Sequence, residues 1–214
     1  MSKNSADQLR VRLRSLRDAI PVAERQQGSD MMCLELLRWF DARQMARHMT
    51  FTMGKPLDRP TYPEIVAGFW PLEGEPDLRS VYHHLHNHGC TVVLPAVVKK
   101  HTPLEFHVWR PGDTLKAGAF GVLEPIRGAM LQPTILLVPT LGFTAQGARI
   151  GYGGGYYDRT LAQINETGQP FITIGIAWDQ ARIDKAAGHQ PEDHDYPLDT
   201  ILTPSGWTPA APPV

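Results

Sequence analysis

The residues best suited to chemistry lie between positions 148 and 161, where the sequence reads ARIGYGGGYYDRTL. Glycine permits positive φ and lets backbone N–H groups approach an anion closely, and this segment holds Gly151, Gly153, Gly154 and Gly155. The helical pattern that follows would add the partial positive charge of a helix N-terminus. Arg149 and Arg159 supply charge beside it. The segment therefore predicts a phosphate or nucleotide loop, the alternative being a glycine-rich turn that only lets a strand and a helix pack closely.

The loop matches neither of the common nucleotide motifs. No Gly-Lys-Ser/Thr follows it, so it is not a Walker loop, and its glycine spacing differs from the dinucleotide fingerprint. Asp158 is poorly placed to bind phosphate directly because it carries the same sign of charge. A carboxylate at this position suits a Mg²⁺ ion that bridges phosphates.

The elements that must position this loop alternate between apolar runs and helical patterns. We expect helices over residues 5–20, 30–47, 78–88 and 157–164, and strands over 65–70, 91–98, 104–109, 134–139, 171–178 and 199–204. The run TILLVP is continuous and apolar, as in a central parallel strand covered on both faces. The pattern predicts a single α/β domain with a mostly parallel central sheet, helices on both faces and an N-terminal helical pair.

Two parts of the chain stand outside this pattern. Residues 45–64 are predicted to be an insertion loop before the strand that starts at 65, and residues 207–214 a disordered proline-rich tail after a domain of residues 1–206. In the first helix Leu9, Leu13, Leu16 and Ile20 form an apolar stripe. Its arginines, Arg10, Arg14 and Arg17, are expected from the pattern alone to form a solvated face.

Composition excludes several classes of protein. The chain has 214 residues, a net charge of −1 and a pI near 6.7, which argues against general nucleic-acid binding. Two cysteines cannot build a disulfide scaffold, and no apolar run is long enough to span a membrane. We expect a cytoplasmic protein, a monomer or weak homodimer, that acts on a small molecule without nucleic-acid or membrane partners.

Beyond these patterns, VPTLGFTAQGARIGYGGGYYDRTL (138–161) resembles the signature of the 5-formyltetrahydrofolate cyclo-ligase family. PLEGEPD (71–77), LEFHVWRPGD (104–113), GVLEP (121–125) and HDYPLDTILTP (194–204) resemble further family motifs in the same order. The resemblance implies an enzyme that uses ATP and Mg²⁺ to phosphorylate the formyl oxygen of 5-formyltetrahydrofolate. Ring closure would then give 5,10-methenyltetrahydrofolate with release of ADP and phosphate. The alternative is a nucleotide- or folate-binding homologue that is inactive or has another small-molecule substrate.

The resemblance also implies roles for particular residues. Catalysis would rest on Arg149 and Tyr156, and Mg²⁺ would be held by Asp158 and Asp195. ATP would contact Arg10 and the loop residues Arg149, Ile150, Gly151, Tyr152, Gly153, Gly154, Gly155, Tyr156 and Tyr157. Folate would contact Trp70, Glu75, Trp109 and Tyr156, although core packing is an equally good reading of Trp109 and of the nearby Phe106.

The chain departs from the family pattern at Ala6, at Thr144, at Thr140 with Gly142 and in the stretch 45–64, and one histidine cluster competes with that pattern. Ala6 stands where the family often has lysine, and Thr144 stands where it has aspartate, which puts kinetic competence in question. The segment HHLHNH places His84 and His88 four residues apart, so the two could share a metal on a helix. No local cysteine or acid completes a ligand set, and a solvated helix face is the expected reading of the cluster from His83 to His88.

Overall fold

A seven-stranded sheet forms the centre of the molecule, in the order β12-β11-β9-β6-β1-β2-β3. The computed structural model describes residues 3–52, 64–126, 128–183 and 196–214. The strands are β1 (Ile65–Ala67), β2 (Thr91–Ala96), β3 (Glu105–Val108), β6 (Ile135–Pro139), β9 (Ile172–Ile176), β11 (Thr200–Thr203) and β12 (Gly206–Thr208). The inner members β11, β9, β6, β1 and β2 run parallel, and antiparallel β12 and β3 form the two edges.

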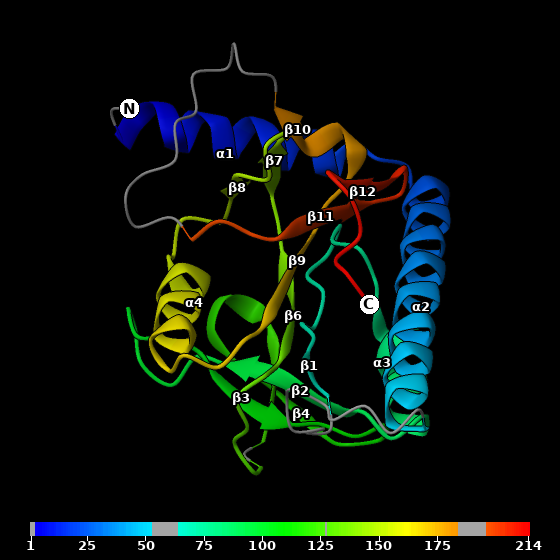
Figure 1. The fold of residues 1–214 in the computed structure, drawn as a ribbon. Coiled ribbons are helices and arrows are strands. Elements are labelled where there is room, and N and C mark those ends of the chain that lie inside the picture. Colours follow the sequence, from blue (N-terminus) through cyan, green and yellow to red (C-terminus); the bar gives the residue numbers. More distant parts are fainter. Residues whose placement is uncertain (1–2, 53–63, 127, 184–195) are drawn as a thin grey trace.

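Helices cover both faces of this sheet, as predicted (Figure 1). The long α2 (Val22–Thr52) and α3 (Arg79–Asn87) lie on one face, and α4 (Tyr156–Glu166) lies on the other. The apolar run of β6 explains this arrangement, because Leu137 is buried with the α2–α3 side while Leu136 and Val138 are buried with α4. Helix α1 (Lys3–Asp18) crosses one end of the sheet. It is followed directly in sequence by α2, and the two form the predicted N-terminal helical pair.

A small second sheet, in the order β10-β7-β8, connects the main sheet to α1. Its strands are β7 (Gly142–Thr144), β8 (Arg149–Ile150) and β10 (Arg182–Ile183), and Ile150 and Ile183 pack on Leu13 of α1. Leu13 therefore faces the core as predicted, whereas Leu16 is 39% exposed. The remaining elements are a hairpin of β4 (Leu115–Ala117) and β5 (Leu123–Pro125) and the short helices η1 (Ala119–Gly121) and η2 (Asp179–Ala181).

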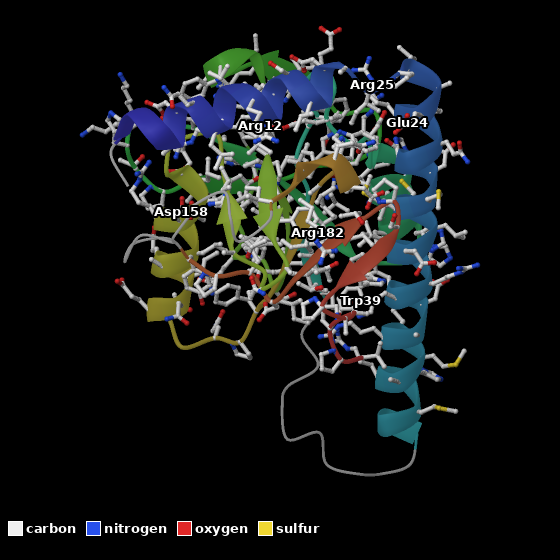
Figure 2. The ribbon with its side chains drawn as sticks, turned by 90° about the horizontal axis from the view of Figure 1, so that it is seen from above. Arg12, Glu24, Arg25, Trp39, Asp158 and Arg182 are labelled. Atoms are coloured by element: carbon white, nitrogen blue, oxygen red, sulfur yellow. The ribbon has the colours of Figure 1, made fainter. Side chains whose placement is uncertain are left out.

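Two predictions about the ends of elements were wrong. Helix α2 continues through Thr52, so residues 45–52 are helical rather than loop, and residues 53–63 lie outside the described part of the chain. The tail is ordered, because β12 pairs with β11 and the indole Nε1 of Trp39 donates to the carbonyl of Pro212 at 2.7 Å. Trp207 also packs beside Trp39, with 6.2 Å between ring centroids, at the place Figure 2 labels Trp39.

The strand order creates a crevice at the carboxyl ends of β1 and β6. From β1 the chain moves outward to β2, and it later returns to the other side of β1 as β6. Connections therefore leave these two neighbouring strands in opposite directions, the arrangement that places ligand sites at strand carboxyl ends in open α/β sheets. Within the described residues, no helix is both long and apolar enough to cross a membrane.

Candidate active site

The glycine segment forms the turn from β8 into α4. Gly153 and Gly155 have φ of +93° and +62°, and Gly155 is the N-cap of α4 in the left-handed conformation. Only glycine adopts such angles without a steric penalty of roughly 1–2 kcal/mol. The sequence-based expectation of a glycine turn at a helix N-terminus is confirmed.

Arginine side chains occupy the space in which any residue other than glycine would place its Cβ atom. A Cβ on Gly151 would lie 2.6 Å from Nη1 of Arg149, and one on Gly155 would lie 2.7 Å from Nη1 of Arg159. The guanidinium carbon of Arg10 would lie 3.4 Å from a Cβ on Gly153. The glycines thus permit both the backbone turn and the close approach of three cations to it. Such a cationic loop at a helix N-terminus is suited to bind a polyphosphate.

The arginine face of α1 lies on this loop rather than in solvent. Arg10 donates from Nε to the carbonyl of Gly151 at 3.2 Å, and Arg14 donates from Nη2 to the carbonyl of Tyr152 at 3.5 Å. Arg17 donates from Nη1 to the Tyr152 hydroxyl at 3.2 Å. The solvated-face prediction was therefore wrong for all three, because burial of Leu13 on the small sheet turns this side of α1 toward the loop.

Arg149 forms a buried ion pair with Asp158 at the start of α4. Their side chains are 6% and 15% exposed, and Nη2 of Arg149 lies 2.5 Å from Oδ1 of Asp158. Figure 2 labels Asp158 in the first turn of α4. The Nε atoms of Arg149 and Arg159 are buried without a hydrogen-bond partner among the described residues, so both donors could bind an anion.

Of the two predicted Mg²⁺ ligands, one lies in the described part of the chain. Asp158 is described and holds Arg149 with one carboxylate oxygen, whereas Asp195 lies outside the described residues. Among the residues that the structure describes, no group of three or more His, Cys, Asp or Glu side chains could hold a metal ion. Mg²⁺ typically uses one or two carboxylates together with substrate phosphates and water, so the single carboxylate of Asp158 fits a nucleotide-bound ion.

Glu75 lies in a pocket beside the loop. The hydroxyl of Tyr152 donates to its Oε1, and the backbone N–H of Leu72 donates to its Oε2 at 2.8 Å. Burial raises the pKa of the Glu75 carboxyl, and the two hydrogen bonds and the charge of Arg17 oppose this rise. The indole of Trp178 fixes the turn before Glu75 by donating to the carbonyl of Gly74 at 2.8 Å.

The pocket occupies the crevice at the carboxyl ends of the central strands. Its lining includes Arg17, Phe69, Glu75, Thr140, Tyr152 and Trp178. Phe69 follows β1, Thr140 follows β6 and Trp178 follows β9, while Arg17 comes from α1. The topology therefore brings together side chains from distant parts of the sequence, and Tyr152 belongs to both the glycine loop and the pocket.

The other predicted folate contacts, Trp70, Trp109 and Tyr156, do not line this pocket. The ring of Trp70 lies 6.1 Å from that of Trp109, with the guanidinium of Arg79 over its face at 5.3 Å. Trp109 is 3% exposed and belongs to the core on the α2–α3 side. Tyr156 lies on the α4 side, 5.8 Å from the exposed ring of Phe120 and under the guanidinium of Arg159. Of the predicted folate residues, Glu75 is the one that lines the pocket.

Ile150 and Phe106 are core residues, and Tyr157 is partly buried against the core. Ile150 is 4% exposed, and its carbonyl accepts from the N–H of Leu141 at 3.0 Å. Tyr157 packs against the core beneath α4 and lies 5.9 Å from the guanidinium of Arg149, and burial raises its pKa. Phe106 is buried in the same cluster, which agrees with its core reading.

Arg17 and Trp178 line the pocket and were not predicted from the sequence. Arg17 could have been found from its helical spacing, because it shares a face with Arg10 and Arg14 and that face meets the loop. Trp178 ends an apolar strand, and its position at a strand carboxyl end was the available signal.

The structure explains how Thr144 can stand where the family has an aspartate. The Thr144 hydroxyl accepts from the backbone N–H groups of Gln146 and Ala148 at 3.3 and 3.2 Å, so it caps the β7–β8 turn as an aspartate would. Ala6 lies in the first turns of α1 and leaves the cationic face to Arg10 and Arg14.

The histidine cluster forms a stack on α3. The rings of His84 and His88 lie 3.9 Å apart, and Nδ1 of His88 is 2.8 Å from the carbonyl of His84. The ring of His83 packs instead on Trp109. His84 approaches Asp41 of α2 at 3.6 Å, and the described residues contain no third ligand for a metal here.

Comparison with known proteins identifies the family of this chain. The family described as 5-formyltetrahydrofolate cyclo-ligase matches residues 2–204. A protein of that name from Mycolicibacterium smegmatis is 29% identical over 95% of this chain and 96% of its own length, and one from Escherichia coli is 30% identical over 68% and 83%. The 5,10-methenyltetrahydrofolate synthetase structure from Aquifex aeolicus has a TM-score of 0.68 at 22% identity and covers 94% of this chain and 91% of its own. The synthetase from Mycoplasma pneumoniae has a TM-score of 0.66 at 20% identity and covers 93% and 98%. The chain belongs to the 5-formyltetrahydrofolate cyclo-ligase family.

Proposed function

We propose that this protein converts 5-formyltetrahydrofolate to 5,10-methenyltetrahydrofolate, using ATP and Mg²⁺ and releasing ADP and phosphate. The observation that carries the proposal is the junction at Tyr152. Its carbonyl belongs to the arginine-held glycine loop, while its hydroxyl binds Glu75 in the neighbouring pocket. A phosphate loop and a pocket for a hydrogen-bonding substrate therefore share a boundary, as a transfer between two substrates requires.

The nucleotide fits the cationic side of this junction. The ATP phosphates would be held by Arg10, Arg149 and Arg159 and by backbone N–H groups of the loop. The buried, unpartnered Nε atoms of Arg149 and Arg159 support this placement. Asp158 would supply one carboxylate to Mg²⁺, which when bound neutralises phosphate charge. Asp195 remains the second proposed ligand.

The folate fits the pocket side. The Glu75 carboxylate has four lone-pair sites, two of which accept from Tyr152 and Leu72, so further sites remain for N–H donors of a reduced pterin. Trp70 and Tyr156 are proposed to wall the bound folate. For Trp109, 3% exposure favours a supporting role behind Trp70 over direct contact.

The proposed chemistry needs positioning and charge stabilisation rather than a covalent enzyme intermediate. The formyl oxygen attacks the γ-phosphorus and the bond to ADP breaks. N10 then attacks the formyl carbon, loses its proton, and the C–O bond breaks to release phosphate with the former formyl oxygen. Arg149 and Tyr156 would stabilise the negative charge that develops during both steps.

The test is an absorbance assay for methenyltetrahydrofolate with ATP, Mg²⁺ and 5-formyltetrahydrofolate, omitting one component at a time. We expect product only when all three are present. Nucleotide binding without folate turnover would favour the alternative, a binding homologue or an enzyme with another formylated substrate. Product formation without ATP would overturn the proposal. We also expect a cytoplasmic monomer or weak homodimer, which sedimentation at several concentrations would check.

A further inference from the structure

The carboxylate of Glu75 is the end of a directional chain of hydrogen bonds that begins on α1. Arg17 donates from Nη1 to the Tyr152 hydroxyl at 3.2 Å, and that hydroxyl donates its own proton to Oε1 of Glu75. Oε2 is held by the N–H of Leu72. Arg17 has no acceptor atom, so the direction of the chain is fixed at its first member.

Burial affects the protonation of two members of this hydrogen-bond chain, Glu75 and Tyr152. The same burial that raises the pKa of Glu75 also raises the pKa of Tyr152, so Tyr152 keeps its proton and stays a donor to the carboxylate. The charged and titratable groups facing Glu75 come from four elements. Three of them are Arg17 of α1, Tyr152 of the loop and Tyr157 of α4. The fourth element is α2, from which Arg25 approaches the neighbouring residue Gly74.

We propose that Arg17 and Tyr152 are positioning residues that keep Glu75 ionised and aimed into the pocket for the N–H donors of the substrate. The inference rests on the folate site of the proposed function. A protonated Glu75 would lose acceptor capacity and present an O–H to the pterin donors. Arg17 and Tyr152 therefore act on folate recognition through Glu75, and their contribution depends on pH.

The sign of the pH effect follows from the geometry. Arg17 and the Tyr152 hydroxyl both lower the pKa of Glu75, against the larger effect of burial. Removing either one leaves burial less opposed, so Glu75 takes up a proton at a higher pH. Folate affinity should then be lost at a higher pH than in the unmodified protein, while ATP affinity keeps its pH profile.

The experiment measures 5-formyltetrahydrofolate and ATP-Mg²⁺ binding calorimetrically from acidic to neutral pH. The variants are Tyr152→Phe, Arg17→Met and Arg17→Lys, and the control is Arg12→Met, an exposed arginine of the same helix labelled in Figure 2. Loss of a charge-assisted hydrogen bond predicts about tenfold or more weaker folate binding for Tyr152→Phe and Arg17→Met. Both should shift the acidic midpoint upward, Arg17→Lys should restore part of the loss, and Arg12→Met should match the unmodified protein.

The infrared carboxyl band of Glu75, assigned with Glu75→Gln, provides a second readout that needs no folate. Its protonation midpoint should rise in Tyr152→Phe and Arg17→Met. Unchanged midpoints in both variants, with normal folate binding by the unmodified protein, would overturn this inference alone. Failure of the unmodified protein to bind any folate would overturn the proposed function together with the inference.

Discussion

Gly155 and Gly168 offer a matched pair that separates backbone strain from ligand binding. They lie at opposite ends of α4, with φ of +62° and +70°. An alanine at either position would carry left-handed strain of roughly 1–2 kcal/mol. A Cβ on Gly168 would meet no atom within 4 Å, whereas one on Gly155 would lie 2.7 Å from Nη1 of Arg159.

We therefore expect the same backbone strain at both positions, some additional loss of stability in Gly155→Ala from the displaced Arg159 hydrogen bond, and unequal effects on nucleotide binding. Each alanine should lower the melting temperature by about 2–8 °C, the range that 1–2 kcal/mol gives for a chain of this size. Gly155→Ala should also displace Arg159 from the carbonyl of Gly154, to which it now donates at 2.6 Å. If Arg159 binds phosphate, the loss of a charge-assisted hydrogen bond should weaken ATP-Mg²⁺ binding about 10- to 150-fold.

Calorimetric titration with ATP-Mg²⁺ and thermal unfolding of both variants check this prediction. Gly155→Asn and Gly168→Asn serve as second variants, because asparagine tolerates the left-handed conformation better than alanine does. Asparagine should recover stability at both positions without restoring nucleotide affinity at position 155. Equal ATP affinity in Gly155→Ala and Gly168→Ala would refute the assignment of Arg159 and the loop to nucleotide binding.

Three further predictions concern single side chains. Glu75→Gln should weaken 5-formyltetrahydrofolate binding by an amount equivalent to a few kcal/mol and leave ATP binding intact, and equal loss of both in paired titrations would indicate a general structural defect instead. Arg149→Ala should lower nucleotide affinity at least about tenfold and also destabilise the fold by about 3–5 kcal/mol, because Asp158 would remain buried and unpaired. Recovery of stability in Arg149→Ala combined with Asp158→Asn would confirm the ion pair, and unchanged nucleotide affinity in Arg149→Ala alone would contradict the binding role. Trp39→Phe should lower the free energy of unfolding by about 1–3 kcal/mol through loss of the bond to Pro212, and an unchanged denaturant midpoint would contradict a stabilising role for the tail.

The sequence was sufficient for features that depend on local chemistry. The apolar run of residues 134–139 became β6 (Ile135–Pro139), and the glycine turn before α4 followed from the angles that only glycine adopts. Asp158 was placed correctly at the start of that helix, but its pairing with Arg149 was missed, because nothing in the local pattern distinguishes a metal ligand from an ion-pair partner.

The errors share a physical cause, which is contact between distant segments. The arginine face of α1 looks solvent-exposed in sequence, yet its partners lie at Gly151 and Tyr152. The proline-rich tail has the composition of a disordered segment, yet Trp39 and the β12 pairing hold it in place. The two- and three-residue strands of the small sheet show no periodicity of their own, because their pairing partners determine them.

The separation of α1 from its loop has a consequence for synthesis on the ribosome. Arg10 and Gly151 are 141 residues apart in the chain, so at typical translation rates Arg10 emerges roughly 7–28 s before its partner. During this time the face of α1 that will meet the loop has nothing to contact in the native arrangement. An arginine face remains well hydrated over such an interval, whereas an apolar face of the same size would invite aggregation of the nascent chain. The charge that is suited to bind phosphate in the finished protein thus also keeps this face of the first helix hydrated while the rest is made.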